Sequence, residues 1–384
     1  MIEVTFETAG LAAAAQKAGR VAPSKGVAFD KAAGVLIEGR PNEVDHKAIT
    51  VKATNLEVDY LEWVRPLEIK SDGDFDWRIP SGLFSGFVGG LPIGSGKKVT
   101  FTQDEPGGPL TMKSGRTKAR IGVITGLGFK NWEPYDSSAM QEVEGFSRRV
   151  NQVSWATDPQ TVPFSGVHID GEHIYATDRY KMVRVPCKVP LPEPVTVPLD
   201  TLAPILKTVE DVRLGVSERH LLLMPDEYTQ LQTVIFDAEY PPIERAMHAN
   251  FDVRVVLPRI SFRDAVQRML SLVGKGERYP KITLDIHDDV IDLFMAVDGV
   301  GEMTDTIEVE IDAEPEAADS TTIYFSPQYL TQALDNSRES SMTLQFLSSS
   351  PGRAASVTDG KGYDVWLMPR KATDPGEVKK EDDE

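Results

Sequence analysis

Ile174-Tyr175-Ala176-Thr177-Asp178 has the alternating pattern of a strand and ends at an aspartate. A similar unit occurs three times along the chain. The other two copies are Ile49-Thr50-Val51-Lys52-Ala53-Thr54-Asn55 and Ile291-Asp292-Leu293-Phe294-Met295-Ala296-Val297-Asp298. Alternation of apolar and polar residues predicts a half-buried strand, and Asn or Asp favours a turn because its side chain bonds to the nearby backbone. The three copies lie about 120 residues apart, which predicts three similar domains.

A second landmark recurs at a similar distance and strengthens the prediction of a repeat. Ile79–Phe84, Val197–Leu202 and Phe325–Leu330 each place a Pro or Ser between a strand end and an apolar helical stripe. Each third also opens with a strand and a helix. The predicted pairs are Glu3–Glu7 with Leu11–Arg20, Glu142–Phe146 with Ser147–Ala156, and Phe251–Leu257 with Pro258–Leu270.

Two helices and a larger number of strands per third predict an α+β fold. Each helix has an apolar face that must pack on a sheet. We expect three repeated domains, each with two helices packed on antiparallel sheets, at residues 1–133, 134–250 and 251–372. Residues 373–384 contain Pro, Gly and mostly charged residues, which predicts a disordered acidic tail.

The composition bounds the class of protein. The chain has 384 residues, a formal net charge of −18 and a single cysteine, Cys187. An acidic surface repels nucleic acid and anionic membranes in general, and one cysteine cannot form an intramolecular disulfide. The N-terminal residues do not resemble a signal peptide, and no stretch approaches the length of a membrane span. We therefore expect a soluble cytosolic protein.

Basic residues are concentrated on the first helix of each third, which contrasts with the acidic whole. Arg148 and Arg149 lie in the first turn of the second of these helices, and three arginines follow Pro258 in the third. For one helix the simpler interpretation is an ordinary solvated face. Three similarly placed helices favour a shared positive surface that faces a phosphate backbone.

Several short motifs occur in a characteristic order. They are Ala53-Thr54-Asn55-Leu56-Glu57, Ala176-Thr177-Asp178-Arg179-Tyr180-Lys181-Met182, Tyr240-Pro241-Pro242-Ile243-Glu244-Arg245, Phe325-Ser326-Pro327-Gln328-Tyr329-Leu330 and Leu367-Met368-Pro369-Arg370. With these motifs, residues 1–372 resemble the bacterial-type DNA sliding clamp, the beta subunit of DNA polymerase III. The resemblance is to a divergent member, which a phage could encode.

The resemblance implies a ring of two chains joined head to tail, with helices lining the hole and sheets outside. It implies encircled double-stranded DNA, a DNA polymerase and a clamp-loader ATPase as partners. It also implies DNA replication in the cytoplasm of a bacterium, or of the host if a phage encodes the protein. No cofactor, metal or catalytic activity is implied.

The resemblance assigns three sets of residues. The expected DNA-binding lining is Lys17, Arg20, Lys25, Arg148, Arg149, Lys207, Arg259, Arg263 and Arg268. The expected partner-peptide pocket is Phe164, Thr177, Arg179, Tyr180, Lys181, Met182, Pro241, Arg245, Tyr279, Ser326, Tyr329, Trp366, Leu367, Met368 and Pro369. The expected dimer interface is Thr117, Ile121, Leu272 and Val273. Met182, Tyr329 and Leu367 are equally compatible with a plain core role.

The chain departs from the family pattern at several places. Arg179 stands where the family has glycine, Trp366 stands where it has a smaller aliphatic residue, Gly274 and Gly276 fall near Leu272 and Val273, and the chain continues past Lys371 into the acidic tail. The departures near Leu272 and at Trp366 leave an alternative open, which is a scaffold or decoy with the clamp fold that would bind clamp-directed peptides without encircling DNA.

Motifs for catalysis or metal binding are incomplete. Gly94–Lys98 lacks the first glycine and the Ser or Thr of a P-loop, and Asp72, Asp74 and Asp76 begin a calcium loop without its glycine and final glutamate. The group from His168 to His173 contains Asp170-Gly171, which favours a hairpin turn. Cys187 follows a proline without a neighbouring histidine that would activate it. We therefore predict that the protein is not an enzyme.

Overall fold

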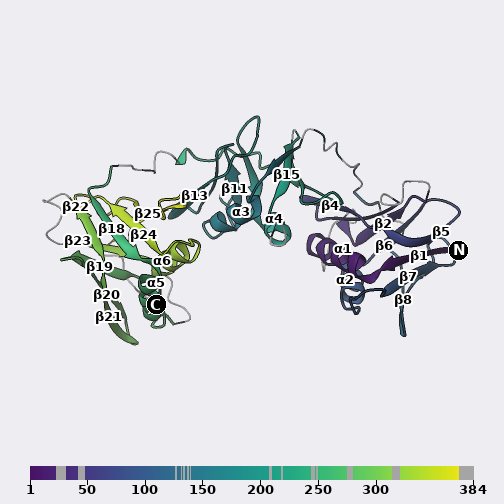
Figure 1. Ribbon diagram of the computed structural model, residues 1–384, viewed down its shortest axis with the longest axis horizontal. Helices are drawn as coiled ribbons and strands as arrows, with labels where there is room; N and C mark the ends of the chain where they lie inside the picture. Colours follow the sequence, from purple (N-terminus) through teal and green to yellow (C-terminus); the bar gives the residue numbers. More distant parts are fainter. Residues whose placement is uncertain are drawn as a thin grey trace, which may run out of the picture. The chain divides into compact units, whose positions relative to one another are not determined.

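The computed structural model describes residues 1–371 except 23–31, 42–47, 126–127, 131, 133–134, 136–137, 139, 207–209, 218, 244–246, 248–249, 275–279 and 314–320. The chain divides into two compact units (Figure 1). Unit 1 comprises residues 1–148 and 189–236, and unit 2 comprises residues 149–188 and 237–384. The predicted acidic tail lies outside the described residues.

Unit 1 contains two antiparallel sheets. The first has the order β5-β1-β7-β8-β9, and the second β10-β15-β16-β17-β4-β3-β2-β6. The strands of the first are β5 (Pro66–Lys70), β1 (Ile2–Glu7), β7 (Lys98–Gln103), β8 (Leu110–Ser114) and β9 (Thr117–Ile121). Those of the second are β10 (Gln141–Val143), β15 (Val212–Val216), β16 (His220–Met224), β17 (Thr229–Val234), β4 (Val58–Trp63), β3 (Ile49–Thr54), β2 (Val35–Gly39) and β6 (Phe75–Ile79). Unit 1 also contains β14 (Val195–Pro198).

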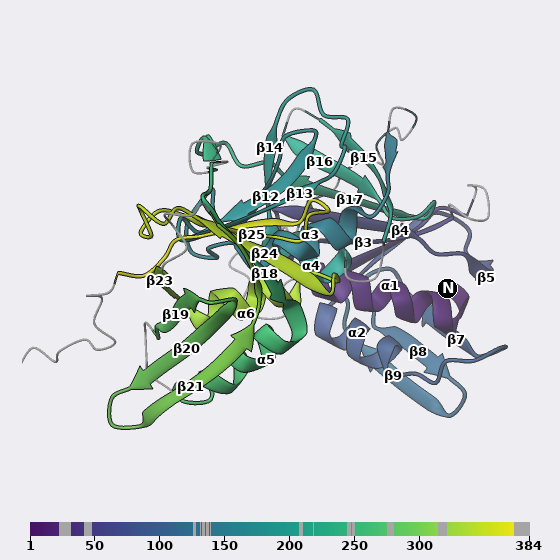
Figure 2. The ribbon, with the colours of Figure 1, turned by 60° about the vertical axis from the view of Figure 1, so that its left-hand side comes forward.

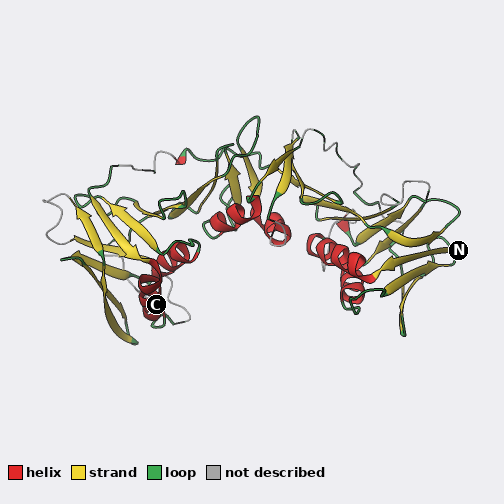
Figure 3. Ribbon diagram, viewed as in Figure 1, coloured by secondary structure: helices red, strands yellow, loops and turns green. Residues whose placement is uncertain are grey.

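The helices of unit 1 are α1 (Thr8–Val21), α2 (Ser81–Gly89) and α4 (Leu199–Leu206). α1 packs beside α2 and against β3 and β4 (Figure 3). An aromatic core lies beneath this helix pair, with the ring of Phe101 at 5.6 Å from Phe6 and 6.0 Å from Trp77. The indole of Trp77 is fully buried and donates to Gln103 Oε1 at 3.0 Å, so this core contains no unpaired indole N–H.

Unit 2 contains an eight-strand array in the order β11-β12-β13-β26-β25-β24-β18-β22 and a four-stranded sheet in the order β21-β20-β19-β23. The strands of the array are β11 (Gly166–Ile169), β12 (His173–Thr177), β13 (Lys181–Pro186), β26 (Asp364–Leu367), β25 (Ala355–Thr358), β24 (Ser341–Phe346), β18 (Val253–Pro258) and β22 (Glu310–Ala313). The four-stranded sheet contains β21 (Gly301–Glu308), β20 (Val290–Val297), β19 (Ile282–His287) and β23 (Thr321–Phe325).

The helices of unit 2 are α5 (Arg259–Leu270) and α6 (Pro327–Asp335). α5 packs beside α6 and along β21, the outer strand of the β20–β21 hairpin (Figure 2). The remaining helix, α3 (Phe146–Ser154), crosses the chain position at which unit 1 gives way to unit 2.

The middle repeat contributes strands to both units. In unit 1, β17 pairs with β4 of the first repeat, with Leu231 opposite Tyr60. In unit 2, β13 pairs with β26 of the last repeat, with Met182 opposite Trp366. Backbone hydrogen bonds therefore continue from the middle repeat into each neighbour, which explains why three repeats form two compact units. The domain boundaries that we predicted remain a prediction.

The local sequence signals are confirmed. The repeated strand is β3 in the first repeat, β12 in the second and β20 in the third. The second landmark leads into α2, α4 and α6, and the opening helices are α1, α3 and α5. Asp170-Gly171 forms the predicted hairpin turn between β11 and β12, with Gly171 at a φ of 100°.

Candidate functional site

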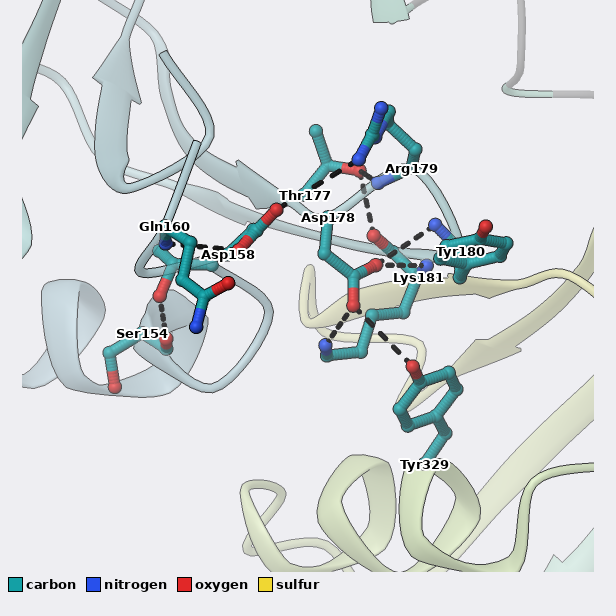
Figure 4. Close-up of polar contacts among 10 residues, drawn as sticks. Ser154, Asp158, Gln160, Thr177, Asp178, Arg179, Tyr180, Lys181 and Tyr329 are labelled. Atoms are coloured by element: carbon teal, nitrogen blue, oxygen red, sulfur yellow. Dashed lines mark hydrogen bonds and ion pairs between the residues drawn. The ribbon is translucent and has the colours of Figure 1, made fainter. Parts of the chain in front are cut away.

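The turn between β12 and β13 in unit 2 is built by side chains that bond to their own backbone (Figure 4). Asp178 Oδ1 accepts hydrogen bonds from the amides of Tyr180 and Lys181, both at 2.9 Å. The amide of Arg179 donates to Thr177 Oγ1 at 3.0 Å. These bonds hold Arg179 at a φ of 79°, a conformation that favours glycine. A strained residue of this kind persists only where its surroundings determine it, and such residues cluster at functional sites.

Lys181 points inward from this turn and is 7% exposed. Its ammonium pairs with Asp178 Oδ2, and the hydroxyl of Tyr329 on α6 lies 3.5 Å from the same oxygen (Figure 4). The ammonium also lies 4.6 Å from the centre of the Tyr329 ring and 5.9 Å from that of Trp155. Burial, followed by the charge of Asp178, raises the pKa of Tyr329, so its hydroxyl stays protonated at neutral pH. This cluster joins the turn to α6.

A buried apolar cluster lies beyond the turn. It contains Tyr175, Met182, Tyr240, Ile243 and Trp366, and Met247 packs against it. Met182 on β13 and Trp366 on β26 are register partners, which brings the middle and last repeats together at this point. The Nε1 atom of Trp366 is buried and has no hydrogen-bond partner among the described residues.

Aromatic and cationic side chains surround this cluster. The ring of Phe164 lies edge-on to Tyr240 at 6.3 Å, and the guanidinium of Arg179 lies 5.4 Å from the centre of the Phe164 ring. Arg184 lies 5.2 Å from the Trp366 ring and pairs with Asp364 at 2.6 Å. The cations cover aromatic faces without burying their charge, as cation–π contacts do elsewhere.

Two large apolar side chains stand exposed next to these groups. Tyr180 is 61% exposed and Met368 is 41% exposed. The Met368 amide donates to the Tyr180 carbonyl at 2.9 Å, so the two residues are held side by side. Exposed apolar side chains beside an aromatic cluster are typical of surfaces that bind a partner.

The described residues of the predicted pocket are buried, partly buried or exposed. Thr177, Lys181, Met182, Ser326, Trp366 and Leu367 are buried, whereas Arg179, Tyr180 and Met368 are exposed. Phe164, Pro241, Tyr329 and Pro369 are partly buried, and Arg245 and Tyr279 lie outside the described residues. The buried group positions the surface, and the other described residues are those that a ligand can reach.

Sequence analysis missed several residues of this region. Asp178 was identified only as a turn residue and Tyr175 only as part of the repeated strand, and Trp155 and Arg184 were not assigned to the site. The recurrence of Asn or Asp at the end of the repeated strand was the one available signal. The contact of Arg184 with Asp364 joins residues 180 positions apart in sequence, and that of Trp155 with Tyr363 joins residues 208 positions apart, so no local pattern indicates them.

The described cations of the predicted DNA-binding set lie on α1, α3 and α5, the first helix of each repeat, and they have partners in the chain. Lys17 Nζ lies 3.2 Å from Glu62 Oε2, and Arg148 Nε lies 3.5 Å from Glu210 Oε1. Arg20 and Arg149 also interact with other groups. Lys25 and Lys207 lie outside the described residues.

The three arginines of α5 are also engaged. Arg259 Nη1 donates to the carbonyl of Leu334 near the end of α6 at 3.1 Å. Arg263 Nε pairs with Asp335 at 2.8 Å, and Arg268 pairs with Asp305 on β21. Arg259 therefore holds α6 to α5, whereas Arg263 and Arg268 remain on the surface.

The predicted interface residues lie at or near the edges of two sheets. β9, which contains Thr117 and Ile121, is the last strand of its sheet in unit 1. Leu272 and Val273 follow α5, the helix that packs along β21, and β21 is the last strand of its sheet in unit 2. The exposed charges on β9 are Lys118 and Arg120, whereas those on β21 are Glu302 and Glu308.

Comparison with solved structures identifies the architecture. The DNA polymerase III beta subunit of Thermotoga maritima superposes with a TM-score of 0.83 at 21% identity, covering 97% of this chain and all of that one. The DNA polymerase sliding clamp of Bacillus subtilis gives 0.82 at 15% identity, covering 96% and 99% of the two chains. This chain has the sliding-clamp fold. The Pseudomonas aeruginosa beta subunit agrees, with a TM-score of 0.80 at 19% identity over 96% of this chain and all of that one.

Sequence comparison detects a similarity to sliding clamps only weakly. The beta sliding clamp of Streptococcus pneumoniae is 23% identical over 141 residues, which span 37% of this chain and 36% of that protein. No protein-family model matches the chain. The predicted α+β clamp fold is confirmed by structure, and the sequence has diverged far from these clamps.

Other features of the described residues set limits on the chemistry. No helix in the described ranges is long and apolar enough to cross a membrane. No group of three or more His, Cys, Asp or Glu in the same ranges could hold a metal ion. Burial raises the pKa of Cys187 to about 11, so at neutral pH its thiol carries a proton and is a poor nucleophile.

Proposed function

We propose that this protein is a DNA sliding clamp, a processivity factor that encircles duplex DNA. In this proposal two copies join head to tail and the cation-bearing helices line the hole. The ring tethers a DNA polymerase, and a clamp-loader ATPase opens it for loading. The protein would act in the cytoplasm, where the DNA is replicated, and has no catalytic step.

The observation that carries the proposal is the clamp fold itself, which extends over 97% of the chain. A ring holds DNA by its topology, so strong phosphate contacts are unnecessary and would oppose sliding. An acidic protein with a net charge of −18 can therefore encircle DNA, provided that the positive charge is concentrated on a few helices.

The decoy alternative is not favoured. A decoy needs the peptide-binding surface of unit 2 but has no need of a complete clamp fold with open sheet edges in unit 1. Here each unit has an open edge strand, β9 in unit 1 and β21 in unit 2. Their exposed charges are of opposite sign. Sedimentation at micromolar concentration tests this, because the clamp predicts twice the chain mass of 42.3 kDa and the decoy predicts a single chain.

We also propose that partner proteins bind at Tyr180, Met368 and the aromatic groups next to them. Tyr180→Ala combined with Met368→Ala should weaken the binding of a partner polymerase's apolar clamp-binding peptide by more than about 1 kcal/mol, since exposed anchors dominate such surfaces. Calorimetric titration measures the affinity. Tyr180 and Met368 contribute only backbone atoms to the hydrogen bond between them, so the fold should be unaffected.

The matched control replaces Tyr228 and Ile93, which are 49% and 63% exposed in unit 1, by alanine. This control removes a similar apolar area away from the proposed surface and should leave the affinity unchanged. Equal affinity of the Tyr180/Met368 variant and the unsubstituted protein would exclude these residues as the partner surface.

A further inference from the structure

Four cations on the first helices share one feature, which is a carboxylate partner within the same unit. Arg148 on α3 lies 3.5 Å from Glu210, with side chains that are 42% and 62% exposed. Arg263 on α5 lies 2.8 Å from Asp335, with side chains that are 36% and 44% exposed. These pairs come from different repeats and use acids from different parts of the chain.

The same arrangement recurs at other cations of this set. Lys17 on α1 lies 3.2 Å from Glu62 and 3.9 Å from Asp226. Arg268 on α5 pairs with Asp305, and its own side chain is 56% exposed. Thus all three helices that open a repeat carry cations whose charge is already balanced.

Stability alone is a weak reason for these pairs, because exposed ion pairs contribute little to folding. The pairs have a larger effect on the attraction that an approaching phosphate experiences than on folding stability. A paired cation has most of its field cancelled a few ångströms away, where solvent ions screen what remains. A DNA phosphate that approaches Arg148 or Arg263 must exchange with a carboxylate that is already there, so each contact yields little net attraction.

We propose that the carboxylates of Glu210 and Asp335 compete with DNA phosphate for Arg148 and Arg263. This competition lowers the affinity of the two arginines for phosphate, so that the ring can slide along DNA. This inference rests on the proposed clamp function and adds a role for acidic residues beside the cations. The acids set how strongly each arginine binds phosphate, while closure of the ring keeps the DNA inside.

The test compares the unsubstituted protein with Glu210→Gln combined with Asp335→Asn. These changes keep the shape of each side chain. They free Arg148 for phosphate and remove one of the two carboxylates that pair with Arg263, because Asp264 Oδ1 stays at 3.0 Å from Arg263 Nη1. Binding to a short linear duplex should tighten by about threefold or more at low salt. Log K should also fall more steeply with log salt, by about one unit of slope or more, since Arg148 is released fully and Arg263 in part. Rings loaded on DNA should also diffuse more slowly in single-molecule tracking.

The matched control is Glu105→Gln combined with Asp72→Asn. These two exposed acids lie in the β7–β8 and β5–β6 turns of unit 1, and their replacement removes the same net charge. The proposal expects the control to behave as the unsubstituted protein does. Equal tightening in both variants would show a general charge effect and overturn the proposal, as would no tightening in either.

The clamp function has a separate readout in the same experiment. If the unsubstituted protein remains on closed circular DNA and only the affinity test fails, the inference about Glu210 and Asp335 is wrong and the clamp stands. If the unsubstituted protein is not retained on closed circles, the proposed clamp function and this inference are both wrong.

Discussion

Lys118→Glu combined with Arg120→Glu in β9 should convert the proposed dimer into single chains that still fold. β9 and β21 are the end strands of their sheets, and an end strand offers unpaired backbone groups to another strand. In a head-to-tail dimer, β9 of one copy would extend the sheet that ends in β21 of the other. The strand that carries Lys118 and Arg120 would then lie beside the strand that carries Glu302 and Glu308, and reversal would place like charges on the two strands.

We expect dimerisation to weaken by about 3 kcal/mol or more, roughly a hundredfold in Kd, because like charges across an interface cost several kcal/mol. Sedimentation equilibrium measures the change. Adding Glu302→Lys and Glu308→Lys to the same chain should restore the dimer, since the opposite signs are then exchanged. No general loss of folding can produce this rescue.

The control for this prediction replaces Lys97 and Lys98 by glutamate at the start of β7. Both are exposed, and β7 lies inside the same sheet, so the charge change is equal but no edge is affected. The control should remain dimeric. If the Lys118/Arg120 variant dimerised as tightly as the control, the assignment of β9 to the interface would be wrong.

Asp178→Asn should destabilise unit 2 by about 3 kcal/mol, because it leaves the buried ammonium of Lys181 without a counter-charge. Asparagine retains the oxygen that accepts the amides of Tyr180 and Lys181, so the turn itself can still form. Urea unfolding followed by tryptophan fluorescence reports the change, since Trp155 lies 5.9 Å from the ammonium. Partner-peptide binding should fall with it, because Asp178 Oδ2 also joins the turn to α6 through Lys181 and Tyr329.

Asp178→Asn combined with Lys181→Met should recover most of this stability, because the buried charge is then removed along with its partner. Glu339→Gln provides the control for an exposed pair, since Glu339 and Lys361 are 34% and 69% exposed at 2.7 Å. That change should cost at most about 1 kcal/mol. An equally small cost for Asp178→Asn would mean that Lys181 gains its counter-charge elsewhere.

The fold could be predicted largely from local signals. Alternation in 174–178 and the turn residue that follows specify a strand and its end, and Pro or Ser before an apolar stripe specifies a helix start. These signals act within a few residues, and repetition along the chain supplied the domain number. The pairing of β17 with β4 and of β13 with β26 could not be predicted, because it joins residues of different repeats.

The candidate site was predicted less completely, and Lys181 shows why. In sequence it is one more cation beside Arg179, but in the structure it is buried under Trp155 and Tyr329 and paired with Asp178. The cations that we propose line the ring show the same limit. The sequence places Arg148 and Arg263 on helices, but it does not place Glu210 or Asp335 beside them, because those contacts depend on tertiary packing.

Retention on nicked circular DNA at raised salt tests the central claim most directly. The protein is loaded, the salt is raised to screen surface attraction, and the bound fraction is measured before and after a single cut that linearises the circle. The sliding clamp predicts that the bound fraction persists on the intact circle and falls soon after the cut. Equal release from circular and linear DNA would contradict encirclement.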